Sequence, residues 1–265
     1  MTNPLTYNNN LDKMPEGFKF KISPSQFPKF VDRPHEWFRS EVLKEKDFTH
    51  NTSSVIGTIV HYCAEMVAKE QEVDVEAINE YIDSWEVNET YDPVIVRNQW
   101  QEMAERLVND YVLDREFLAV EEFKCGEVRD GFYIGGVEDV LEGTKEDCML
   151  GDYKTYHSKT KPRAIPAGYK YQLLTLAALW KKHGYNVTRI RLIYINRHIE
   201  GEISEKTGKQ LKSYPPEVTV LTETITPADF EFIESLLELC VDSVEAAEKH
   251  PELVHVIFHD GRLRI

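Results

Sequence analysis

Two aspartates and a lysine lie close together in the sequence, in a pattern that suits metal-assisted hydrolysis of a phosphodiester. Asp152 and Lys154 belong to the segment Asp152-Tyr153-Lys154, and Asp139 precedes Asp152 by thirteen residues. Carboxylate oxygens are the ligands that hard divalent cations prefer, and a lysine beside the attacking water offsets the charge that develops on the phosphate. These residues therefore predict a metal-dependent nuclease site.

Basic residues are concentrated directly after this motif. The chain has 31 Lys and Arg against 46 Asp and Glu, a formal net charge of -15, yet residues 153–199 contain ten Lys or Arg and no Asp or Glu. A locally basic face can bind a phosphate backbone on an otherwise acidic protein. We expect Lys159, Lys161, Arg163 and Lys170 to hold DNA ahead of the scissile bond. The alternative is a solvated helix and strand surface with no ligand.

The bulk composition is that of a packed globular protein. Hydrophobic residues make up 42% of the 265 residues, and the four cysteines are scattered without a Cys-x-x-Cys pair, so neither a zinc site nor a disulfide framework is indicated. No apolar run approaches the roughly 20 residues that cross a bilayer, and the first ten residues lack a signal-peptide pattern. We expect no membrane association and a cytoplasmic protein, in the host cytoplasm if a phage encodes it.

The chain is expected to form a single domain after a short lead-in. Residues 1–18 are polar and contain Pro4 and Pro15, which predicts a flexible segment. The domain over residues 19–265 then has three parts: a mainly helical region, an α/β catalytic core, and a C-terminal helix with a tail, at residues 19–115, 116–226 and 227–265.

Periodicity and turn residues predict the elements of this domain. Ser23 is a candidate N-cap with Pro24 at the first helical position, and Pro28 and Pro34 divide the following stretch into short helical pieces. Further helices are predicted over residues 52–71, 75–85, 93–114, 166–183 and 227–249. Strands are predicted over residues 117–128, 132–141, 148–153, 189–196 and 217–225, with Asp130-Gly131 as a hairpin turn. This order predicts an α/β fold with a mixed central sheet flanked by helices.

The ordered motifs resemble the PD-(D/E)XK nuclease superfamily, and within it the RecB-like branch that includes phage-type exonucleases. That family places an Asp after Gly-x-x on its second core strand and an Asp-x-Lys on the third. The segments Gly136-Val137-Glu138-Asp139 and Asp152-Tyr153-Lys154 match residue for residue. The resemblance, which covers roughly residues 19–225, implies a restriction-endonuclease-like core with an N-terminal helical elaboration.

An upstream helix supplies a further element of this branch. Gly57 is followed by His61 and then Glu65, similar to the Gly-x-x-x-His helix that precedes the strands in relatives. His61 and Glu65 are four residues apart and share one helix face. The resemblance implies that His61 binds a metal and that Glu65 supports the site from outside the metal ligands. The alternative is an ordinary His–Glu pair on a helical region.

A glutamine on the helix after the third strand completes the pattern. Gln172-Leu173 resembles the Gln-Leu-x-x-Tyr of the branch, which implies that Gln172 orients Lys154 or a phosphate oxygen. Leu176 replaces the tyrosine, and Tyr169 or Tyr171 could supply the phenol from the previous turn. A helix glutamine can also simply bond a backbone carbonyl.

Two other family features concern the first strand and the cysteines. Relatives often carry an acid on the first strand, and alternation places one of Glu121 and Glu122 on the site face; we prefer Glu121, acting on a metal-bound water. Relatives with a Cys-Pro after the Ser-x-Ser opening hold an iron–sulfur cluster, whereas this chain has Arg33-Pro34 and a single later cysteine, Cys240. We expect no iron–sulfur cluster.

The resemblance implies a metal-dependent DNA nuclease, with exonuclease action in DNA recombination, repair or degradation. Asp139, Asp152, His61 and the Tyr153 carbonyl would bind Mg²⁺ or Mn²⁺, and Lys154 would position the attacking water. DNA is the expected partner, together with a single-strand annealing or other recombination protein. The alternatives are a non-cleaving nuclease-fold module for DNA binding or assembly, a structure-specific endonuclease, and a phosphatase with a closed pocket. Cleavage polarity, strand preference and oligomeric state stay open.

Overall fold

The computed structural model describes residues 3–6, 10–45, 50–201, 203 and 208–259. Its main sheet has five strands in the order β2-β5-β6-β7-β8. These strands are β2 (Phe117–Val120), β5 (Val140–Thr144), β6 (Asp147–Tyr156), β7 (Val187–Asn196) and β8 (Val218–Thr224). β6 and β7 are parallel, and the other neighbours are antiparallel. The mixed α/β sheet predicted from the sequence is therefore confirmed.

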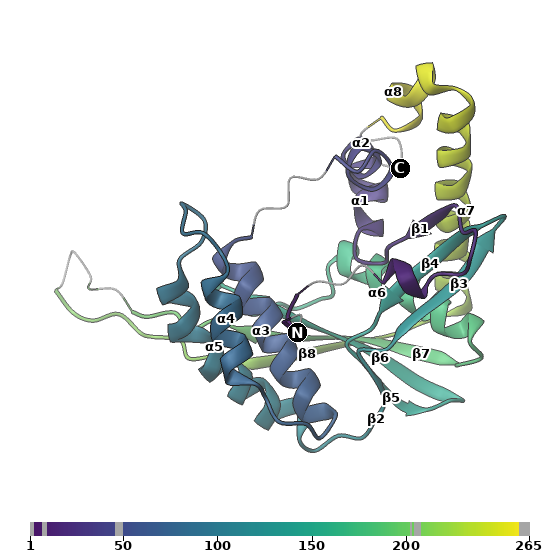
Figure 1. Cartoon of the computed structure of the whole chain (residues 1–265). Coiled ribbons are helices and arrows are strands. Elements are labelled where there is room, and N and C mark those ends of the chain that lie inside the picture. Colours follow the sequence, from purple (N-terminus) through teal and green to yellow (C-terminus); the bar gives the residue numbers. More distant parts are fainter. Residues whose placement is uncertain (1–2, 7–9, 46–49, 202, 204–207, 260–265) are drawn as a thin grey trace.

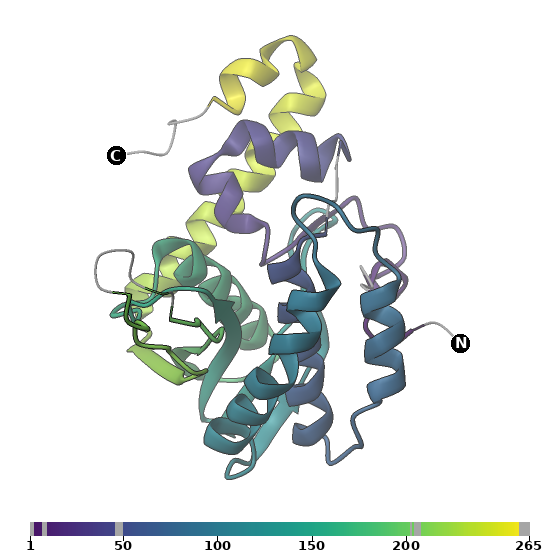
Figure 2. The same ribbon diagram turned by 90° about the vertical axis from the view of Figure 1, so that its left-hand side faces the viewer.

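Helices cover both faces of this sheet (Figures 1 and 2). One face carries α3 (Thr52–Ala68), α4 (Val75–Asp83) and α5 (Pro93–Leu107), and the other carries α6 (Ala167–Lys182), against which α7 (Pro227–Lys249) packs. Side chains of a strand alternate between the two faces, so β6 sends Leu150 into the core under α6 and Tyr153 into the core under α3. Helix α6 is the crossover that the parallel pair β6 and β7 requires.

A second sheet of three strands lies beside the first. It contains β1 (Phe20–Ile22), β4 (Phe132–Val137) and β3 (Phe123–Arg129), with β1 parallel to β4. Asp130 and Gly131 have φ angles of 48° and 89°, the left-handed conformation of a tight hairpin turn. The predicted hairpin is confirmed, whereas the three residues of β1 are too few to show a strand period in the sequence.

The two sheets are joined where two predicted strands bend. Residues 117–128 and 132–141 were each expected to form one strand. Instead the first divides at Glu121-Glu122 and the second at Glu138-Asp139, so that both cross from one sheet to the other. The backbone N–H of Glu121 donates to the Asp139 carbonyl at 3.3 Å. The bend positions four acidic residues at the junction of the sheets.

The N-terminal helices begin later than the sequence predicts. Ser23 starts a turn, because the N–H groups of Gln26 and Phe27 both donate to its carbonyl, and α1 (Phe27–Asp32) follows. Pro28 lies in the first turn of α1, where its missing N–H is not needed, so it does not break the helix. α2 (Pro34–Trp37) begins at a proline as predicted, and one π-helical turn, Phe38–Val42, extends it.

The described part of the lead-in is anchored, which differs from the expected flexible segment. Leu5 is buried in the core beside α3 and α4, and the Asn3 side chain donates a hydrogen bond of 2.8 Å to the Ala77 carbonyl. At the other end of the chain, α8 (Val254–Ile257) follows a 3-10 turn, Pro251–Leu253, and Phe258 stacks on Phe38. In the described part of the chain, no helix combines the length and apolar character that crossing a membrane requires.

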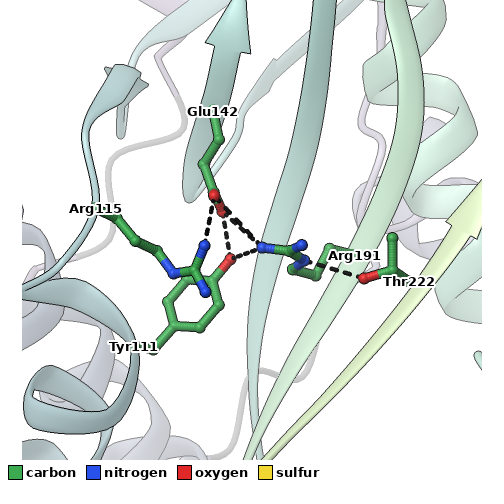
Figure 3. Close-up of polar contacts among 5 residues, drawn as sticks. All are labelled: Tyr111, Arg115, Glu142, Arg191 and Thr222. Carbon is green, nitrogen blue, oxygen red and sulfur yellow. Dashed lines mark hydrogen bonds and ion pairs between the residues drawn. The ribbon is translucent and has the colours of Figure 1, made fainter.

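A buried ionic network holds β5, β7 and the end of α5 together (Figure 3). The Glu142 carboxylate accepts hydrogen bonds from the Tyr111 hydroxyl and from the guanidinium groups of Arg115, at 3.0 Å, and Arg191, at 3.3 Å. Tyr111 lies on a π-helical turn that continues α5, and Arg191 also donates to Thr222 of β8. One carboxylate therefore pairs with two guanidinium groups, and the network links four elements.

We predict that Glu142→Gln lowers the free energy of unfolding by about 3 kcal/mol, because removal of one partner leaves the other charges uncompensated in a buried place. Glu217→Gln is the matched control, since Glu217 forms an exposed ion pair with Lys161 and should contribute less than about 1 kcal/mol. Urea unfolding of the two variants measures the difference. Equal losses would contradict the role of the network.

Candidate active site

Asp139 lies at the junction of the two sheets and is held from two sides. Its Oδ2 accepts the backbone N–H of Tyr153 at 2.5 Å and lies 3.5 Å from Nδ1 of His61. Helix α3 brings His61 there because it packs directly against β6: a Cβ added at Gly57 would be 3.4 Å from the Thr155 hydroxyl. The structure thus brings together two residues that the sequence separates by 78 positions.

Glu121 joins these two residues in a possible metal-binding group. One ligand atom from each of His61, Glu121 and Asp139 lies within 4.8 Å of the others. Burial, together with the negative charges of Asp139 and Glu65, raises the pKa of Glu121 to about 9. The sequence analysis placed Glu121 outside the metal ligands, whereas the structure groups it with His61 and Asp139. A histidine nitrogen and two carboxylates fit a divalent cation, whose charge would offset the repulsion between the acids.

Asp152 and Lys154 form the second half of the site. They point to the same face of β6, as two residues separated by one must. Lys154 Nζ lies 2.5 Å from Asp152 Oδ2, and the Gln172 side chain donates to Asp152 Oδ1 at 2.9 Å. Gln172 was expected to orient Lys154 or a phosphate; here it orients Asp152.

The protonation of this pair follows from its environment. Burial raises the pKa of Asp152 to about 6, against the opposing effect of Lys154. Burial by itself would lower the pKa of Lys154, but the carboxylates of Asp152 and Asp139 raise it above its ordinary value. Lys154 is therefore held in its charged form inside the site.

Of the two tyrosines that could replace the missing phenol, Tyr169 is the one beside Lys154. The ammonium of Lys154 lies 5.4 Å from the centre of the Tyr169 ring, a cation–π distance. Tyr171, the other candidate, packs on Phe232 of α7 instead. Tyr169 is thus the tyrosine that contacts the site, and Leu176 lines its wall.

The acidic and basic side chains of the site and Gln172 face one cavity of about 550 Å³. The predicted site residues that line it are His61, Glu65, Glu121, Asp139, Asp152, Lys154 and Gln172. Ser23 and Ser25, from the Ser-x-Ser segment, line it as well. Tyr153 takes part through its N–H, while its ring packs edge-on against the His61 ring in the core below. The role of its carbonyl as a ligand stays a prediction.

Two acidic residues near the cavity have other partners. Glu65 pairs with Lys69 at 2.6 Å rather than with His61, so the simple His–Glu pair does not form. Glu138, which the sequence analysis did not single out, is buried and accepts hydrogen bonds from the Trp180 indole at 3.1 Å and from the Glu122 N–H at 3.2 Å. Burial raises the pKa of Glu138 to about 8. Glu138 thus links the strand bend beside Asp139 to Trp180 of α6. The sequence, which shows two adjacent acids here, does not predict this role.

The expected DNA-holding lysines and arginine lie outside the cavity. Lys161 pairs with Glu217, and Lys170 lies 3.2 Å from Glu223 and 3.5 Å from Asp229. Lys159 and Arg163 are exposed and form no ion pair with another described residue. Their contact with DNA stays a prediction.

Comparison with known proteins identifies the family. Residues 21–251 match the PD-(D/E)XK nuclease superfamily, and the chain belongs to this superfamily. Among solved structures, a provisionally named exonuclease from Eubacterium rectale is similar with a TM-score of 0.54 and 10% identity, over 92% of this chain and 86% of that chain. An alkaline exonuclease from Laribacter hongkongensis has a TM-score of 0.37 and 13% identity, over 75% of this chain and 95% of that chain. No curated protein matches the sequence.

We predict that Mn²⁺ raises the melting temperature of the protein and that Asp139→Asn removes most of this rise. A ligand that binds only the folded state at 100 times its Kd adds about 2.7 kcal/mol of stability. The control is Asp147→Asn, because Asp147 is exposed at the start of β6 and pairs with Arg189. Thermal unfolding with and without Mn²⁺ measures the effect. An undiminished rise in Asp139→Asn would place the metal elsewhere.

Proposed function

We propose that this protein is a Mg²⁺- or Mn²⁺-dependent deoxyribonuclease that acts as an exonuclease in DNA recombination, repair or degradation. The observation that supports this proposal best is the single cavity shared by Asp139, Asp152 and Lys154, with His61 and Glu121 beside them. Superfamily membership supports phosphodiester hydrolysis. The proposed exonuclease activity is based on the name of the similar structure from E. rectale.

The residues of the cavity have complementary tasks in this reaction. Asp139, Asp152, His61 and Glu121 would hold the metal, which supplies charge neutralisation and activation of water when bound. Gln172 fixes the rotamer of Asp152, and the Tyr153 N–H fixes that of Asp139. Lys154, kept charged by the two aspartates, donates hydrogen bonds to the attacking water or to a non-bridging phosphate oxygen. Its charge acts most strongly when the phosphate gains charge in the transition state.

We predict that Lys154→Ala lowers kcat by about 10³-fold, roughly 4 kcal/mol, while DNA binding changes little. A lysine that acts on the transition state affects kcat, whereas one that only holds the backbone affects binding. Lys159→Ala is the matched control, because Lys159 is exposed five residues further along the chain. Steady-state cleavage at saturating DNA, with binding measured separately in EDTA, distinguishes the two. Similar kcat values in both variants would remove Lys154 from the chemistry.

We predict that the protein degrades linear DNA progressively and leaves covalently closed circular DNA intact, because an exonuclease needs an end. The substrate is a plasmid before and after linearisation, incubated with Mg²⁺, Mn²⁺ or EDTA. Asp152→Ala serves as the blank for contaminating nuclease. Cleavage of both forms would indicate the structure-specific endonuclease, and binding without cleavage of either would indicate the non-cleaving module.

A further inference from the structure

Arg197 is a buried cation directly after β7. Its side chain donates hydrogen bonds from Nη1 to the Ser53 hydroxyl at 3.0 Å and from Nε to the side-chain oxygen Oε1 of Gln99 at 3.3 Å. Only 9% of the residue is exposed. Both partners are neutral, and the amide of Gln99 is fixed by a second bond to the His198 carbonyl. The guanidinium is therefore held in place without a negatively charged partner among the residues that the structure describes.

This arrangement differs from that of the other basic residues in the segment 153–199. Six of the ten form ion pairs with acidic residues: Lys154, Lys161, Lys170, Lys181, Arg189 and Arg191. Three more are exposed: Lys159, Arg163 and Lys182. Arg197 is the remaining one, buried and with no ion pair to any residue in the described ranges. An uncompensated buried charge costs several kcal/mol, so its retention points to an anionic ligand.

Arg197 lies behind the wall of the cavity and is connected to it through Ser53. The backbone N–H of Arg197 donates at 2.8 Å to the carbonyl of Tyr156, two residues beyond Lys154 on β6. Ser53 lines the cavity in the first turn of α3, a 17-residue helix whose N-terminal end favours negative charge. Because the Ser53 oxygen accepts from Arg197, its hydroxyl hydrogen can be donated to another oxygen. The nearby acid Glu102 is engaged with His198 at 3.0 Å.

We propose that Arg197 and Ser53 form a subsite for a backbone phosphate of the nucleic acid strand, adjacent to the phosphate that is cleaved. The proposal rests on the proposed nuclease function and adds the residues that fix the strand beside the cut. A phosphodiester supplies the missing negative charge, and its two non-bridging oxygens can accept from the remaining guanidinium N–H groups and from the serine hydroxyl. Burial lowers the pKa of Arg197, as expected for a cation that has no counterion among the described residues.

The test compares Arg197→Gln with Arg189→Gln. Arg189 lies near the opposite end of β7 and pairs with Asp147 at 3.1 Å, so its loss removes the same charge away from the subsite. Binding of a fluorescent oligonucleotide is measured in EDTA over a range of salt concentrations. Arg197→Gln should weaken binding roughly tenfold and flatten the log–log salt slope by about one unit, while Arg189→Gln leaves both unchanged. An unchanged slope and affinity in Arg197→Gln would overturn the proposal.

A second readout separates ligand binding from a structural role. Inorganic phosphate should raise the melting temperature of the wild type and of Arg189→Gln more than that of Arg197→Gln; equal shifts in all three would count against the subsite. If Arg197→Gln does not fold, Ser53→Ala tests the subsite instead, because this substitution removes the serine hydroxyl and keeps the charge of Arg197. It should weaken oligonucleotide binding about fivefold with the salt slope retained. Wild-type affinity in Ser53→Ala would then overturn the proposal.

The same experiments keep this proposal distinct from the nuclease function. Cleavage by the wild type together with unaltered binding by Arg197→Gln would reject the subsite and leave the nuclease function standing. Binding that depends on Arg197, without cleavage by the wild type in Mg²⁺ or Mn²⁺, would reject the nuclease function and support the subsite.

Discussion

The bend shared by two antiparallel strands is the constraint on which the rest of the site depends. At Glu121-Glu122 and at Glu138-Asp139 the strands leave the five-stranded sheet and enter the three-stranded one. The Glu121 N–H bonds the Asp139 carbonyl, and the Glu138 carboxylate ties the bend to Trp180 of α6. Without the bend, Asp139 would lie within a regular ladder, and α3 could not bring His61 to its carboxylate. The interruption of the sheet at the bend therefore provides the space in which the site lies.

Charge compensation differs between the site and the rest of the interior. Glu142 is buried like Asp152 of the candidate site, but two arginines and a tyrosine donate to its carboxylate, and it stabilises the fold. At the bend, Glu121 lies among other acids and its pKa rises to about 9. Arg197 shows the opposite excess, a buried cation among neutral partners. Ionisable groups whose charged forms are not compensated by the protein thus lie at the proposed metal and phosphate positions, in keeping with the tolerance of such conflicts at functional sites.

The sequence predicted the elements whose signals are local. Thr226 and Pro227 mark the start of α7, and its predicted range matches the structure; the alternation of Asp152 and Lys154 correctly places both on one face of β6. The bend has a weaker signal: adjacent acids interrupt the apolar residues of 117–128 and 132–141, which alternation alone does not distinguish from solvent-facing strand positions. The left-handed φ of 50° at Glu121 is imposed by tertiary contacts, and a glutamate gives no warning of it. Strand alternation predicts which face Glu121 points to. It does not predict that Glu121 lies within 4.8 Å of His61 and Asp139.

The basic stretch shows why charge counted along a sequence differs from charge presented to a ligand. Lys161 and Lys170 meet carboxylates of Glu217, Glu223 and Asp229, which lie at least 53 positions away in the chain. A lysine already neutralised by the protein must break that pair before it binds a phosphate, so it adds little net affinity. The cations that contribute most to binding are those without an acidic partner. By that criterion Lys159, Arg163 and Arg197 rank above Lys161 and Lys170, and Arg197 is the buried one of the three, which the charge pattern does not distinguish from its neighbours.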